Sequence, residues 1–221
     1  MYFEIGAEAA ANAVIAGLGD AVRQIEASHG AALLGRPDIY ICPTAECHAR
    51  NALTPSARAE NRPFGRTVIL QGRVLMDEQR LQPVLTNELS HPFWFQRGTR
   101  CHPRWWVEGL AVERSGGGGA GAQPHANAVL ALLDGTRFTD LEESCWMRDS
   151  ATRAGMGWPM FYRQAAMFEG WLRERDGVAF GSTPAMLRNA AALTPAIESS
   201  FGVSLFALWQ DWQASVAEVA P

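Results

Sequence analysis

The sequence predicts an α+β fold, with a small β-sheet in the first third of the chain and helices elsewhere. Two short apolar runs bounded by turn residues, 38–42 and 66–70, are typical of strands. From residue 81 onward the apolar residues recur at helical spacing. Of the 221 residues, 48% are apolar and 19% charged, so the chain can bury a sizeable core as one domain, or as one domain with a helical extension.

Charge and hydropathy exclude several classes of partner. The net charge of −4 gives no general attraction for nucleic acid or anionic lipid. No apolar run approaches the roughly 20 residues needed to span a bilayer. The first residues carry no basic segment followed by an apolar one, so no signal peptide is visible. We therefore expect a cytoplasmic protein by default, or a periplasmic one if an upstream export signal has been removed.

The first 70 residues predict a helix followed by the two strands. Residues 7–28 are rich in alanine with apolar residues at helical spacing, and His29-Gly30 is a suitable stop. The strand 38–42 ends at Pro43. Residues 44–65 predict a short helix and then an irregular loop, and the second strand covers 66–70.

The chain has four cysteines, at positions 42, 47, 101 and 145. Cys42 and Cys47 are five residues apart, which is not the Cys-x-x-Cys spacing of zinc knuckles or thioredoxin-like sites. Two alternatives remain open for this pair: a structural disulfide or two buried free thiols. We expect no zinc site built from cysteines, because a second spaced pair is missing.

The helix that begins near Asp77 or Glu78 has two kinds of face. Leucines recur every four residues from Leu81 to Leu89 and predict a buried stripe. Asn87, Glu88 and His91 lie on another side of the helix. Pro92 predicts a kink or an end of this helix.

The next helix begins at Pro103 and continues to Ser115. The glycine run 116–119 ends it; this run lacks the lysine of a phosphate-binding loop, so no nucleotide site is expected.

The rest of the chain predicts helices at 127–133 and 158–175, followed by two or three shorter segments. Apolar anchors of the last segments are Leu205, Leu208, Trp209 and Trp212. We expect two halves of one domain: an α+β half at 1–120, which holds both motif helices, and a helical half at 121–221.

Two motifs carry a resemblance to a known family. The run from Asn87 to His91, Asn-Glu-Leu-Ser-His, fits the zinc motif His-Glu-x-x-His except at its first position. The run from Trp105 to Ala111, Trp-Trp-Val-Glu-Gly-Leu-Ala, follows on the next predicted helix. With both, the chain resembles the gluzincin metallopeptidases of the peptidase MA-like branch, over roughly residues 35–215.

The resemblance implies a zincin-like fold, a zinc cofactor and the hydrolysis of peptide bonds in a peptide or protein substrate. It implies His91 and Glu108 as metal ligands, with Asn87 at the position of the first histidine ligand. Glu88 would be the general base, and Tyr162 the donor that stabilises the oxyanion, a role that Arg163 could take instead. The strand 66–70 would be the edge strand along which an extended peptide lies.

Asn87 is the departure from the family's pattern. Its neutral amide oxygen is a poorer zinc ligand than imidazole. Three interpretations follow: a weak ligand in a site that still holds a divalent ion, a site that has lost its metal, or an introduced replacement of histidine in a working enzyme. His102, between the two motif helices, could replace the missing ligand. The alternative function is a catalytically inactive zincin-fold protein that binds a peptide or protein partner.

Each site residue also has a plain structural interpretation. Glu108 could be a surface carboxylate, and Tyr162 a core aromatic on an apolar helix. The tryptophans near the motifs are Trp94, Trp105 and Trp106, which could belong to the core or line a substrate cleft. Glu113 is assigned to the surface or to the second layer around the site.

Overall fold

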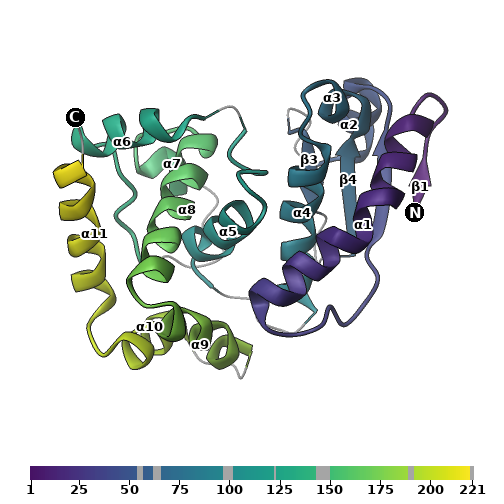
Figure 1. Cartoon of the computed structure of the whole chain (residues 1–221). Helices are drawn as coiled ribbons and strands as arrows, with labels where there is room; N and C mark the ends of the chain where they lie inside the picture. Colours follow the sequence, from purple (N-terminus) through teal and green to yellow (C-terminus); the bar gives the residue numbers. More distant parts are fainter. Residues whose placement is uncertain are drawn as a thin grey trace. The chain divides into compact units, whose positions relative to one another are not determined.

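The computed structural model describes residues 1–53, 57–61, 66–96, 102–121, 123–142, 150–188 and 192–219 (Figure 1). The chain divides into two compact units, Met1–Gly98 with Arg114–Gly118 and Thr99–Glu113 with Gly119–Pro221. The positions of the chain's parts relative to one another are not determined. No helix within the described residues is long and apolar enough to cross a membrane.

The first unit combines one small sheet with helices. Its elements are β1 (Tyr2–Phe3), α1 (Glu8–His29), β2 (Asp38–Cys42), α2 (Ala45–Asn51), β3 (Ala59–Asn61), β4 (Thr67–Gln71), α3 (Gly72–Asp77) and α4 (Leu81–Phe95). The predicted helix at 7–28 and the strand at 38–42 are confirmed. The elements β1, β3 and α3 were not predicted. Parts of the predicted loop, 54–56 and 62–65, lie outside the described residues.

The sheet has the strand order β1-β2-β4-β3, with β3 antiparallel to β4 and the other two pairs parallel. In β4, Val68, Ile69, Leu70 and Gln71 are all buried, as expected of a central strand. The prediction that the strand at 66–70 is an edge strand is therefore wrong. β4 has a partner on each side, and β1 and β3 form the edges.

Helix α1 packs along α4 through small side chains (Figure 1). Its buried positions include Ala10, Val14, Ala21 and Ile25, which follow helical spacing. The helix ends at Gly30, whose φ of 65° is left-handed and whose N–H bonds the carbonyl of Glu26. The predicted stop is confirmed.

A disulfide joins Cys42, at the end of β2, to Cys47 in the first turn of α2. Both cysteines are buried and pack with Ile69 of β4. The Thr44 hydroxyl caps the same turn by accepting a hydrogen bond from the Cys47 N–H. Of the two alternatives left open by the sequence, the structure has the disulfide. Cys101 and Cys145 lie outside the described residues.

Helix α4 does not end at Pro92, although proline lacks the N–H that would bond the carbonyl of Glu88. A proline inside a helix costs about 3 kcal/mol. Phe93 and Trp94, which follow Pro92 in the helix, are both buried. The burial of each stabilises the fold by roughly 2–3 kcal/mol. Burial therefore outweighs the lost hydrogen bond, and the helix continues to Phe95.

Helix α5 (Arg104–Arg114) ends at a glycine turn, as predicted. Gly116 and Gly117 have φ values of 69° and 99°, which favour glycine. Gly118 lies against α4: a Cβ there would be 2.2 Å from the Pro83 carbonyl oxygen, and Arg80 Nη2 donates to the Gly118 carbonyl at 2.9 Å. This turn is part of the first unit.

The second unit is helical within its described residues. Besides α5 it contains α6 (His125–Leu133), α7 (Ser150–Arg153), α8 (Trp158–Arg175), α9 (Gly177–Arg188), α10 (Leu193–Phe201) and α11 (Leu205–Val219). The predicted helices at 127–133 and 158–175 and the segments after them are confirmed. Aromatic residues form its core, namely Trp105, Phe138, Phe161, Phe168, Trp209 and Trp212. The α+β class is thus confirmed, whereas a zincin-like topology stays a prediction.

Two helical glycines of the second unit provide a matched test of helix packing. A Cβ on Gly109 would be 2.9 Å from the carbonyl carbon and oxygen of Ala165, whereas Gly181 has nothing within 4 Å. We expect Gly109→Ala to lower the free energy of unfolding by about 1–3 kcal/mol, because α8 must shift. Gly181→Ala should raise it by about 0.5–1 kcal/mol through helix propensity. Urea denaturation measures both, and equal effects would contradict this close approach.

Candidate functional site

Helix α4 brings three predicted site residues onto one face. Glu88 and His91 are three residues apart and Asn87 and His91 are four apart, so a regular helix places their side chains side by side. Asn87 is 2% exposed, and Glu88 and His91 are each 9% exposed. The face is therefore enclosed, with only small parts of the two ionisable side chains reaching solvent.

Helix α4 does not have one buried apolar side and one exposed polar side. Leu81, Leu85 and Leu89 are buried as predicted, but so is every residue from Val84 to Trp94. Inside this run, Ser90 Oγ shares a hydrogen bond of 3.0 Å with Nε2 of His29, a buried residue of α1. The polar residues of α4 thus lie within the protein, where each needs a partner.

Asn87 has an amide nitrogen, Nδ2, that is buried without a hydrogen-bond partner. Leaving a buried polar group unpaired costs about 1–3 kcal/mol. The Asn87 amide can rotate to exchange its NH2 group and its oxygen. Its NH2 group can donate to an acceptor, and its oxygen can face a positively charged group. A bound group that pairs with the Asn87 amide would remove this cost.

Glu108 lies on α5 and is already engaged in an ion pair. Arg104, one helical turn earlier, places Nη1 3.4 Å from Glu108 Oε1, and the Glu108 side chain is 12% exposed. The Arg104 guanidinium also lies 5.4 Å from the centre of the Trp158 ring. Glu108 is therefore not a surface carboxylate. Sequence analysis missed Arg104, although its spacing of four from Glu108 was a usable signal.

Tyr162 is half-buried on α8 among apolar and aromatic neighbours. Its ring centre is 5.6 Å from that of Trp158, and it packs on Val112, Ala120 and Ala166. Because Trp158 contacts both Arg104 and Tyr162, the tyrosine belongs to the same neighbourhood as Glu108.

Arg163, the other residue considered for the oxyanion, donates from Nε to the Gln123 carbonyl at 3.0 Å. Burial lowers the pKa of its guanidinium.

The structure thus forms two groups of predicted residues. Asn87, Glu88 and His91 belong to the first unit, and Glu108 and Tyr162 to the second. Within the described ranges, no three side chains of histidine, cysteine, aspartate or glutamate gather into a group that could hold a metal ion.

The residue types fit zinc in part. Imidazole and carboxylate are standard ligands, whereas the unpaired atom of Asn87 is the donor Nδ2, so a metal would have to bind the amide oxygen instead. Arg104, however, neutralises the Glu108 carboxylate and would compete with a metal for it.

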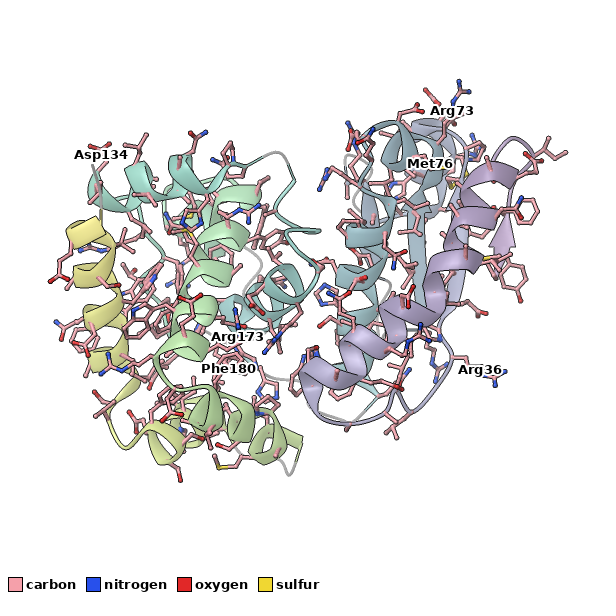
Figure 2. All side chains as sticks on the ribbon, in the orientation of Figure 1. Arg36, Arg73, Met76, Asp134, Arg173 and Phe180 are labelled. Carbon is pink, nitrogen blue, oxygen red and sulfur yellow. A yellow bond between two sulfur atoms is a disulfide. The ribbon has the colours of Figure 1, made fainter. Side chains whose placement is uncertain are left out.

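The three tryptophans near the motifs belong to the core. Trp94, Trp105 and Trp106 are all buried, so they do not line an open cleft. Trp106 contacts Phe180, which is labelled in Figure 2. Glu113 Oε1 lies 3.0 Å from Nη2 of Arg173, which gives Glu113 an ion-pair partner in the second unit. Arg173 is labelled in Figure 2.

His102, the potential substitute ligand, belongs to the second unit, immediately before the segment that leads into α5. It is buried, and desolvation lowers its pKa to about 4. A histidine held neutral in this way carries no charge that would repel a cation at neutral pH.

Comparison with known proteins adds no relative. No family model, no curated protein and no solved structure matches this chain.

The lowered pKa of His102 predicts a pH-dependent stability. In the unfolded chain this histidine gains a proton near pH 6.5, whereas in the folded protein it does so only near pH 4, so stability falls as the pH drops between these values. Between pH 7 and pH 4.5 the free energy of unfolding of the wild-type protein should fall. We expect this fall to be smaller by roughly 2–3 kcal/mol in His102→Gln. Urea denaturation at both pH values measures this, with the exposed His125→Gln as a control that leaves the loss unchanged. An unaltered loss in His102→Gln would contradict the assignment.

Proposed function

We propose that the chain is a gluzincin-like metallopeptidase homologue, acting on peptide bonds, whose metal site is weakened by Asn87. The observation that supports this most directly is the enclosed face of α4, where Asn87 with its unpaired amide lies beside Glu88 and His91. A general base next to a metal ligand is the pairing that metal-assisted hydrolysis requires. The run from Trp105 to Ala111 adds Glu108 as a ligand beside His91, by its resemblance to the same family.

In this proposal His91 and Glu108 hold zinc, with the Asn87 side-chain oxygen as a weak third ligand. Bound zinc would polarise the scissile carbonyl and make a water molecule more acidic. Glu88 accepts the proton from the attacking water and returns it to the leaving amine. Its 9% exposure keeps the carboxylate within reach of water while most of it is enclosed. Tyr162 is the proposed donor to the oxyanion.

Two features of the chain weaken the site. A neutral amide adds less to zinc binding than an imidazole, so the third ligand is poor. Arg104 must also give up part of its ion pair before Glu108 can coordinate a cation, since both compete for the same carboxylate. The expected protein binds zinc weakly and hydrolyses peptides slowly.

The sheet limits where an extended peptide substrate can pair. Since β4 is flanked by β2 and β3, its backbone groups are already used in the ladder. Among the strands of the described residues β1 and β3 are the edges, so an extended peptide that pairs with this sheet would do so at one of them. This replaces the role first assigned to the strand at 66–70.

A second candidate is a non-catalytic protein that keeps the fold and binds a peptide or protein partner. The buried NH2 group of Asn87 favours it, because that group can donate to a carbonyl oxygen of a bound peptide without any metal. Zinc binding separates the two candidates.

Asn87→His should restore a standard ligand and raise the affinity for zinc. Four ligands together supply roughly 10–16 kcal/mol, so one recovered ligand predicts a gain on the order of a hundredfold. Titration against a chromophoric zinc chelator measures the affinity of both proteins. Asn12→His, which adds a histidine at an exposed position of α1, is the matched control and should gain nothing.

Adding His91→Ala to Asn87→His should abolish the recovered affinity. If the wild-type protein binds no zinc and Asn87→His gains no affinity for it, the metallopeptidase proposal is overturned and the peptide-binding candidate is left.

Hydrolysis tests the role of Glu88 separately from metal binding. In zinc-loaded Asn87→His protein, adding Glu88→Gln should keep the metal and lower the rate of casein cleavage about a hundredfold or more, because the proton acceptor is lost. Glu174→Gln, an exposed position on α8, should leave the rate unchanged. Equal rates with and without the Glu88 carboxylate would exclude it as the base.

A further inference from the structure

The second unit contains a cavity that the proposed function does not use. Its volume is about 80 Å³, and its walls include Phe138, Asp140, Ser150, Arg153 and Phe161. The last of these belongs to α8, and the serine and arginine to α7. A cavity of this size holds several water molecules or one small organic molecule.

The wall formed by residues 138–141 is fixed in place before any ligand arrives. Gln164 Nε2 donates to the Thr136 carbonyl at 2.8 Å, and Trp105 Nε1 donates to the Leu141 carbonyl at 2.9 Å. Between these two bonds, the Phe138 ring lies 4.3 Å from that of Trp209. The segment is therefore anchored at both ends and in the middle, so the cavity is preformed.

Ser150 points to a bound polar group. Its side chain is buried, with 5% exposure, and Oγ has no hydrogen-bond partner although it borders the cavity. Buried hydroxyl groups are nearly always paired, so an unpaired one beside a cavity indicates that a partner is supplied from outside. A hydroxyl can donate to a carboxylate oxygen of such a ligand.

The charged residues of the cavity select the ligand's charge. Arg153 Nη2 lies 3.1 Å from Asp140 Oδ2, and the two side chains are 45% and 42% exposed, so the pair is open to solvent. A simple anion beside Arg153 would be repelled by Asp140, and a simple cation beside Asp140 would be repelled by Arg153. A molecule with both charges close together can satisfy both residues, with its carboxylate on Arg153 and its ammonium on Asp140.

From this geometry we infer that the cavity binds a small zwitterion, an α-amino acid with a short apolar side chain. Its carboxylate bonds Arg153 and Ser150, its ammonium bonds Asp140, and its side chain contacts the rings of Phe138 and Phe161. The limited volume excludes large side chains. The inference is independent of the metallopeptidase proposal, because none of these residues takes part in it.

Binding of L-alanine to the full chain tests the charge requirement. Titration followed by amide chemical shifts should give saturable changes at residues around the cavity. Propionate and ethylamine each carry one of the two charges, so each should bind about tenfold more weakly or worse. Propionate binding as tightly as alanine would overturn the zwitterion assignment, and no saturable change with any of the three would mean that the cavity holds water only.

Substitutions of Arg153 and Ser150 test whether these residues bind the ligand. Arg153→Gln should weaken alanine binding about tenfold or more, and Ser150→Ala about fivefold. Arg175→Gln is the matched control and should leave binding unchanged, because Arg175, at the end of α8, forms a similarly exposed pair with Asp211 of α11. Ser150→Ala should not lower the melting temperature, since its hydroxyl has no partner in the protein. Unchanged binding in both cavity variants would overturn the site.

Discussion

The burial of helix α4 on nearly all sides is the constraint on which the first unit depends. Every residue from Val84 to Trp94 is removed from solvent, so the elements around α4 must approach it closely. Helix α1 does so with alanines on its buried face, and Gly118 does so by lacking a side chain. The same burial encloses Asn87, Glu88 and His91, and burying polar groups costs free energy unless something pairs with them.

The elements that were predicted correctly are those determined by residues close together in the sequence. Helices α1 and α8 have apolar residues at a regular spacing, and β2 lies between turn residues, so neighbours along the chain determine them. The missed strands are short: β1 has two residues and β3 has three, and both exist because another strand pairs with them. The place of β4 within the sheet was also mispredicted, because strand order depends on contacts between residues far apart in sequence.

In the candidate site, too, local features were predicted from the sequence and features that depend on distant residues were not. Helical spacing alone predicts that Asn87, Glu88 and His91 share a face, and the structure has them on one helix. The burial of that face could not be read from spacing, since a surface helix can carry the same polar residues. The ion pair of Arg104 with Glu108 and the unpaired hydroxyl of Ser150 depend on the surroundings of each side chain. Of the two outcomes predicted at Pro92, a kink or an end, the end is wrong. The sequence shows the hydrogen bond that proline removes, but it does not show the burial of the turn that follows.

The division of the chain into units has a consequence for the order in which the protein is made. The first unit comprises Met1–Gly98 and Arg114–Gly118, so its last piece is synthesised after most of α5, which belongs to the second unit. Chains fold from the N-terminus as they leave the ribosome. The Gly118 contacts with Pro83 and Arg80 therefore form only when residues 99–113 have already emerged. A nascent chain halted before Gly118 would present α4 without the turn that covers the beginning of this helix.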